Sequence, residues 1–146
     1  MASLTSPRNT VVLLPQQFGS LQPMAAGATA VQGCLVALNG DGYGNAASMT
    51  KATSLKCVGI ANESVDNSAG IAAAQSVVCL TGLVLLDNGT STDTITQADV
   101  GNLCYALDNH TVSRVSTGAS AVGTIRQIVG AGDVGAGQIV VEIDPV

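Results

Sequence analysis

His110 is the one histidine of this chain, and general-base chemistry near neutral pH would depend on it. It stands in the run Asp108-Asn109-His110-Thr111, and small polar residues of this kind are typical of a tight turn. The sequence has neither an HExxH nor a GxSxG motif, and no pair of carboxylates at the spacing of a glycosidase. We therefore expect His110 to shape a turn, and we predict that the protein is not an enzyme.

Two runs have the spacing of binding loops but lack what such loops need. Gly130–Gly135 reads GxGxxG, yet the residues that follow read as a strand, whereas a dinucleotide-binding fold requires a helix there. Asn39–Asn45 alternates like a calcium loop, but Thr50 occupies the position of the bidentate glutamate. We predict a hairpin loop and a surface turn at these places, and no cofactor.

The cysteines are spaced widely, and each lies inside an apolar run. No CxxC pair occurs, whereas a structural zinc site is typically built from closely spaced ligands. A free thiol in apolar surroundings behaves as a small hydrophobic side chain. We predict buried, reduced thiols and no metal site, with a disulfide as the alternative in an oxidising medium, for Cys34, Cys57, Cys79 and Cys104.

The composition is apolar and poor in charge. Hydrophobic residues make up 47% of the chain, charged residues 10% and aromatic residues 2%. Because soluble domains carry about 25% charged residues, the surface must be largely neutral or covered by a partner. The formal net charge is −5, and the five basic residues are scattered rather than clustered. Nucleic-acid binding, which requires a basic patch, is therefore disfavoured.

No segment is long enough to cross a membrane as a helix. The longest apolar run, Val77–Leu86, is interrupted by Thr81-Gly82 and is about half of the ~20 residues that a span requires. Near the N-terminus, Val11–Leu14 is shorter than the apolar core of a secretory signal. We predict no membrane segment, and we expect the chain to remain in the compartment where it is made.

Residues 1–26 differ from the rest of the chain. Their recurring prolines argue against a helix and against a central strand. The apolar segment Val11–Leu14, followed by Phe18, indicates that this stretch docks somewhere, although a disordered tail is the alternative. We predict an extended N-terminal arm over residues 1–26 and a β domain over residues 27–146.

The remainder reads as short strands separated by turns, which predicts an all-β fold, either a small β-sandwich or a β-barrel. Thr96–Asp99 has the spacing of a capping box for a single helical turn, and Ile71–Gln75 could form a short helix. Thr81-Gly82 is either a very tight hairpin or a bend in one strand. The expected strands are Ala30–Leu38, Cys57–Asn62, Ser76–Leu80, Leu83–Leu86, Leu103–Leu107, Thr111–Val115, Ala121–Val129 and Gln138–Ile143.

A series of short motifs runs in order along the β domain. The motifs are Val58-Gly59-Ile60-Ala61, Ala69-Gly70, Val77-Val78-Cys79-Leu80-Thr81-Gly82-Leu83, Asp99-Val100-Gly101 with Tyr105, Asp108 with Thr111-Val112-Ser113, Val122-Gly123 and Ile139-Val140-Val141-Glu142-Ile143. Taken in this order, they resemble the capsid cement, or head-decoration, proteins of tailed bacteriophages. The sequence departs from that pattern in a longer linker over Asp66–Gln75 and in its cysteines.

This resemblance implies a structural virion protein that is made in the host cytoplasm and binds the outside of the mature capsid. It implies a homotrimer that staples neighbouring major capsid subunits, without catalytic residues or a cofactor. The small, neutral side chains fit repeated contacts, because they lose little rotamer entropy when they are buried. We hypothesise that the arm contacts the capsid through Arg8, Val11, Val12, Leu13, Leu14 and Phe18.

Other functions remain open from the sequence. Another self-assembling β protein of a virion, such as a tail, head-fibre base or filament subunit, has the same low charge and small side chains. An enzyme or small-ligand binder would need a convergent set of polar residues, which the sequence does not reveal. An adhesin module is a weaker alternative, because no secretory signal is recognisable.

Overall fold

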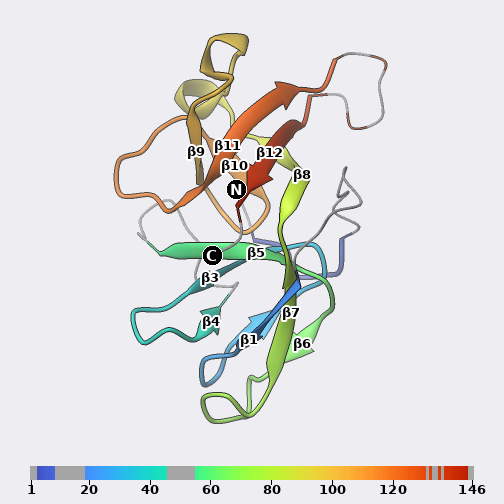
Figure 1. The fold of residues 1–146 in the computed structure, drawn as a ribbon, viewed down its shortest axis with the longest axis vertical. Helices are drawn as coiled ribbons and strands as arrows, with labels where there is room; N and C mark the ends of the chain where they lie inside the picture. Colours follow the sequence, from blue (N-terminus) through green and yellow to red (C-terminus); the bar gives the residue numbers. More distant parts are fainter. Residues whose placement is uncertain are drawn as a thin grey trace.

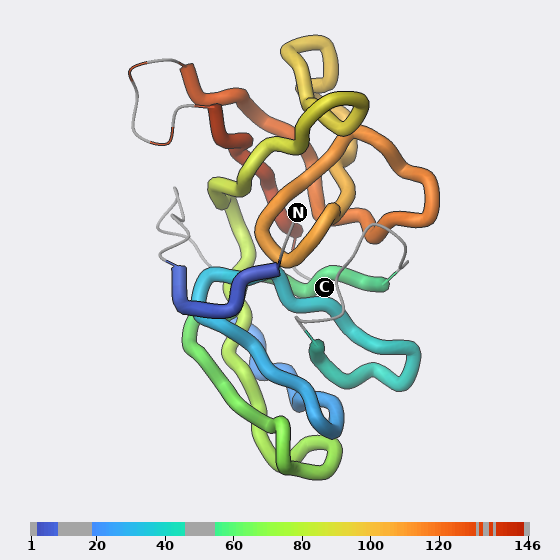
Figure 2. Tube along the Cα trace, turned by 180° about the vertical axis from the view of Figure 1, so that it is seen from behind, coloured from blue at the N-terminus to red at the C-terminus, as the bar shows by residue number. Residues whose placement is uncertain are grey.

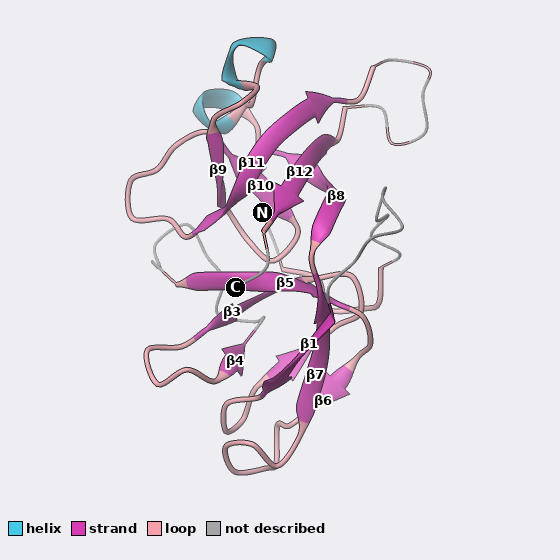
Figure 3. Cartoon of the chain, viewed as in Figure 1, coloured by secondary structure: helices cyan, strands magenta, loops and turns pink. Residues whose placement is uncertain are grey.

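The computed structural model describes residues 3–8, 19–45, 55–130, 132, 135 and 137–144. Strands dominate these residues, and the helical content is limited to two 3₁₀ turns, Ser91–Asp93 and Gln97–Asp99 (Figure 3). The all-β prediction is therefore confirmed. Figure 1 shows two stacked parts, a closed barrel and, beneath it, an open sheet that we term the lower sheet.

The lower sheet is antiparallel, in the order β1-β7-β5-β3-β4. A separate pair of two-residue strands, β2 and β6, lies beside it. The strands of these two sheets are β1 (Gly19–Pro23), β2 (Thr29–Ala30), β3 (Leu35–Leu38), β4 (Gly44–Asn45), β5 (Lys56–Ala61), β6 (Val65–Asp66) and β7 (Ser76–Leu80).

The barrel has five strands in the closed order β10-β8-β12-β11-β9. Only the β8–β10 pair is parallel. Closure leaves these strands without a free edge. They are β8 (Gly82–Asn88), β9 (Leu103–Ala106), β10 (Thr111–Ser113), β11 (Ala121–Ile128) and β12 (Ile139–Ile143).

Strands β3 and β5 separate two hydrophobic cores. Leu35 and Ile60 point into the core that fills the barrel, whereas Val36 and Val58 point into a second core on the other face of the lower sheet. Since successive side chains of a strand alternate between faces, both faces of these strands must be apolar. This two-sided burial explains why the sequence is apolar without alternation over both strands.

The run Ser76–Asn88 crosses from one part to the other. β7 pairs with β1 and β5, whereas β8 pairs with β10 and β12, so the two strands do not pair with each other. Gly82 has a φ of +118°, a backbone conformation that favours glycine. The structure therefore decides for a strand bent at Thr81-Gly82, visible as the continuous chain in Figure 2.

The lower sheet includes residues that the sequence assigns to the arm. Gly19–Pro23 forms β1 at an edge of the sheet, where Pro23 needs no donor to a neighbouring strand. Met24, the next residue, is fully buried in the second core. Residues 19–24 thus belong to the folded body.

Two local expectations have different outcomes. The capping box at Thr96–Asp99 is present and closes a single 3₁₀ turn, as predicted. Ile71–Gln75 forms a turn rather than a helix. There the amide of Ala73 bonds to the carbonyl oxygen of Met24 at 2.8 Å, and Ala73 has a φ of +65°, outside the helical region.

Candidate functional site

Residues 3–8 of the N-terminal segment lie against the body between the barrel and the lower sheet (Figure 2). The amide of Leu4 donates a hydrogen bond to Oδ1 of Asn109 at 2.7 Å. The amide of Arg8 donates to the carbonyl oxygen of Gln32 at 2.8 Å. The backbone of the segment is therefore attached to the body at both of its ends.

Arg8 forms a bidentate ion pair with Asp87 of β8. The distances are 2.9 Å from Nη1 to Oδ2 and 3.1 Å from Nη2 to Oδ1. Gln138 donates to Oδ1 of Asp87 at 2.9 Å, and Nε2 of His110 lies 3.9 Å from Oδ2. We call these four side chains the Arg8 clamp.

The pKa of Asp87 lies below its usual range. Partial burial alone would raise this pKa, but the hydrogen bonds from Arg8 and Gln138 and the positive charge of Arg8 outweigh the burial. The carboxylate is thus held in its charged form by the groups around it. In the clamp, the guanidinium of Arg8 neutralises the carboxylate of Asp87 and attaches the N-terminal segment to β8. This is a structural role.

The turn between β9 and β10 joins the clamp to both parts of the molecule. Oδ1 of Asp108 accepts hydrogen bonds from the amides of His110 and Thr111, both at 2.9 Å, which confirms the predicted turn. The carbonyl oxygen of Asn109 accepts from the amide of Leu35 in β3 at 2.7 Å. This turn therefore fixes the N-terminal segment and the lower sheet to the barrel.

The ring of His110 has polar contacts with side-chain oxygens. Nδ1 lies 3.1 Å from Oδ1 of Asp108 and 3.2 Å from Oδ1 of Asn109, and Nε2 faces Asp87. Within the described part of the chain, none of these contacts is to a hydroxyl or thiol that the imidazole could activate. The arrangement orients the ring and supports the turn.

The predicted arm residues separate into two groups. Arg8 is described and binds Asp87 of its own chain. Val11, Val12, Leu13, Leu14 and Phe18 lie outside the described residues. The sequence analysis did not identify Asp87 and Gln138. A lone arginine in a neutral segment indicates that a counter-charge is needed, but it does not indicate which residue supplies that charge.

A shallow groove of about 450 Å³ lies between the N-terminal segment and the β2–β6 pair. Leu4 on one side and Val31 and Val65 on the other contribute apolar side chains. Since Ser3–Thr5 forms one side, the groove exists only while the N-terminal segment is docked.

All four cysteines are buried and free, as predicted. Burial raises the pKa of Cys34 and Cys57 to about 11 and that of Cys79 and Cys104 to about 12. Among the described residues, no three His, Cys, Asp or Glu side chains gather in a way that could hold a metal ion.

The two motifs that resemble binding loops have the predicted structures. Strands β11 and β12 are antiparallel, and the amide of Val129 donates to the carbonyl oxygen of Gln138 at 2.9 Å, so the described ends of this connection form a hairpin and a strand follows it. Ala131, Asp133 and Val134 of the motif lie outside the described residues. Asn39 and Tyr43 close a tight turn between β3 and β4 by a hydrogen bond of 2.8 Å. In the described part of the chain, no helix has the length and apolarity to cross a membrane.

Comparison of the chain with protein-family models, curated proteins and solved structures finds no match in any of the three. Function must therefore be inferred from the residues and geometry of this chain.

Proposed function

We propose that this protein is a structural virion protein, a cement protein that binds the outside of a mature phage capsid and staples neighbouring major capsid subunits. The proposal is carried by one observation: the polar side chains that could take part in catalysis bind other groups of this chain instead. Arg8, Asp87, Asp108 and His110 are all engaged in holding the chain together. A body that is poor in charged residues and whose polar groups bind one another fits a mechanical role.

The N-terminal region supplies the proposed capsid contact. Residues 9–18, which carry the apolar anchors Val11–Leu14 and Phe18, follow Arg8 and precede Gly19. Arg8 is fixed to the barrel and Gly19 to the lower sheet. A force on the anchors would therefore reach the body through two attachments.

Stapling strengthens a shell by mass action. A protein that binds only the expanded lattice shifts the equilibrium towards that lattice. As a homotrimer, each cement unit would engage several sites at once, which raises the effective affinity by about 10²–10⁴ where the geometry permits. Weak individual contacts by small neutral side chains are then sufficient for stable binding of the trimer to the capsid.

The test is co-sedimentation of the purified protein with expanded heads that have been stripped of decoration. We expect saturable binding to expanded heads, a higher disruption temperature of those heads, and no binding to unexpanded procapsids. A variant with Leu13→Asp and Leu14→Asp should lose binding, because charged side chains resist burial in an apolar contact. The matched control is Leu103→Asp on β9, an exposed leucine of the barrel.

If the double variant occupies expanded heads as fully as the wild type, Leu13 and Leu14 are not capsid anchors. If the wild type binds neither head form, the cement function is excluded. In the latter case another self-assembling virion protein, a tail, head-fibre base or filament subunit, becomes the favoured function. Among the described residues β1 forms an edge of the lower sheet, which supports this second candidate, since sheet edges favour strand addition. Filaments in electron micrographs of the free protein would identify it.

A further inference from the structure

The charged residues are unevenly distributed along the sequence. None occurs between Arg8 and Asp41, and none between Asp66 and Asp87. The structure brings these two stretches together, because β1 comes from the first and β7 from the second, and the two strands pair along their whole length. The lower sheet therefore has a flank that carries no charge.

The face of this flank opposite the second core is apolar. Leu21 lies opposite Val78 in the β1–β7 register, while Val77 and Cys79 point to the second core. Gly19 lies opposite Leu80, and a Cβ at Gly19 would be 3.7 Å from Cδ2 of Leu80. The glycine thus leaves the side chain of Leu80 half-buried on this face. Leu21 itself is 65% exposed.

The loop that leads into β7 lies at the end of the molecule opposite the barrel (Figure 1). It runs beside the end of β1, because the amide of Met24 donates to the carbonyl oxygen of Gln75 at 2.9 Å. Ile71 of this loop is 79% exposed. The buried side chain of Asn67 holds the loop in place: its Nδ2 donates to the carbonyl oxygens of Ala25 at 2.9 Å and of Ile71 at 3.0 Å. Ala73, with its positive φ, adds backbone strain of the kind that clusters at functional sites. An exposed isoleucine is thus presented on a fixed backbone.

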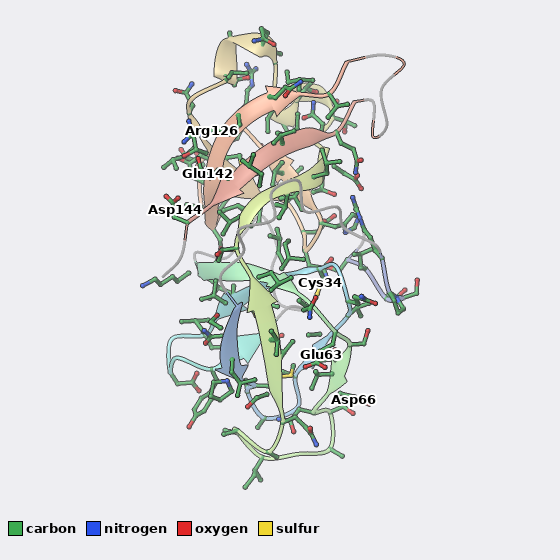
Figure 4. All side chains as sticks on the ribbon, turned by 45° about the vertical axis from the view of Figure 1, so that its right-hand side comes forward. Cys34, Glu63, Asp66, Arg126, Glu142 and Asp144 are labelled. Atoms are coloured by element: carbon green, nitrogen blue, oxygen red, sulfur yellow. The ribbon has the colours of Figure 1, made fainter. Side chains whose placement is uncertain are left out.

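Three large hydrophobic side chains are exposed among the described residues, and two of them, Leu21 and Ile71, come from the two stretches without charge. Of the charged side chains labelled in Figure 4, Arg126 and Glu142 lie on the barrel and Asp66 lies on β6. We define the charge-free surface as Leu21, Pro23, Ile71, Ala74, Val78 and Leu80.

We propose that the charge-free surface is where a second copy of this chain docks. Each copy carries a formal charge of −5, so two copies repel each other at most orientations. A contact through the charge-free surface keeps the charges of both copies outside the interface and removes apolar area from water. A nucleic acid or an anionic lipid finds no cation on this surface, whereas a like-charged copy finds no repulsion. This docking does not depend on head binding.

The experiment is sedimentation velocity of the free protein over a range of concentrations. We expect reversible association of the wild type. Leu21→Asp and Ile71→Asp should each raise the dissociation constant by about tenfold or more, because each removes a buried aliphatic side chain and adds a charge to the contact. Leu103→Asp adds the same charge on the barrel and should leave association unchanged. Circular dichroism verifies that all variants are folded.

A wild type that stays monomeric at its highest soluble concentration would overturn the proposal. So would association that Leu21→Asp and Ile71→Asp leave unchanged, or that Leu103→Asp weakens equally. Head binding is scored separately, so its loss or retention does not affect this result.

A thiol footprint provides an independent measurement. Because the native cysteines are buried, Ala74→Cys would introduce the one accessible thiol of the described surface. We expect its alkylation to slow as the protein concentration rises, whereas Leu103→Cys should react at the same rate at every concentration. Equal behaviour of the two cysteines would place the contact elsewhere.

Discussion

The barrel and the lower sheet solve the problem of exposed strand edges in different ways. The barrel closes on itself, and ion pairs such as Arg126–Glu142 lie on its outside. The lower sheet stays open, with β1 and the two-residue strand β4 at its edges, and its β1–β7 flank carries no charge. The barrel is thus complete as a unit, whereas the lower sheet retains a surface that a partner can cover.

Despite this difference, the two parts share β3 and β5. Leu35 and Ile60 belong to the barrel core although their strands belong to the lower sheet. The barrel core is therefore closed only by β3 and β5 of the lower sheet, whereas the second core contains no residue of the barrel strands. The barrel and the lower sheet thus differ in their surfaces. Because β3 and β5 contribute to the barrel core, we expect the two parts to fold in one cooperative event.

The largest expected effect is that of Leu35→Ala. Leu35 is fully buried in the barrel core on a strand that also forms the second core. We expect a loss of about 2–5 kcal/mol in the free energy of unfolding, because the truncation leaves a cavity. Urea denaturation followed by far-UV circular dichroism and by the accessibility of Cys79 should give one coincident transition.

Val36→Ala is the matched variant, since Val36 is equally buried and faces the second core. Both variants should lower the stability of the whole molecule. If Leu35→Ala instead splits the transition in two, the barrel and the lower sheet fold independently, and the shared core does not couple them.

A smaller difference is expected between cysteines of the two parts. Cys79 lies on β7, next to the edge strand β1, whereas Cys104 lies on β9 inside the closed barrel. Local opening of an edge costs less than opening of a closed barrel. We therefore expect Cys79 to react with a thiol reagent about tenfold faster than Cys104 in low denaturant, which corresponds to roughly 1.4 kcal/mol.

Both thiols should be almost inert in buffer at neutral pH, because burial raises their pKa to about 12 and the thiolate is the reactive form. Peptide mapping after pulse labelling assigns the reacted cysteine. Equal labelling of Cys79 and Cys104 would mean that the edge opens only with the whole fold.

The sequence predicts much of the local structure and little of the long-range structure. Apolar runs identify the strands, and the spacing of Thr96 and Asp99 identifies a capped turn, because these signals depend on near neighbours. The partner of Arg8 is Asp87, and the partner of β1 is β7, both far away along the chain. No local pattern encodes such pairings. Pro23 predicts that its segment is not a central strand. Its actual position, in a strand at the edge of the lower sheet, is known only from the strand order.

The smallest expected effect concerns the Arg8 clamp, which attaches the N-terminal segment to the barrel. Asp87→Asn removes the charge that Arg8 binds while it keeps the size of the side chain. Because Asp87 is 41% exposed and solvent screens the pair, we expect a loss of about 0.5–1 kcal/mol in the free energy of unfolding at pH 7.

This difference should depend on pH with a defined sign. The pKa of Asp87 is lowered in the folded protein, so the ion pair stabilises the fold above the pKa of the unfolded carboxyl, about 3.9. The gap between wild type and Asp87→Asn should be constant from pH 7 to 5 and close as the pH falls through the lower, folded-state value. Asp144→Asn, at an exposed carboxylate after β12, is the control. A gap that persists at pH 2 would show that the asparagine disturbs the bond to Gln138 rather than the charge, and the N-terminal segment would then be held without its ion pair.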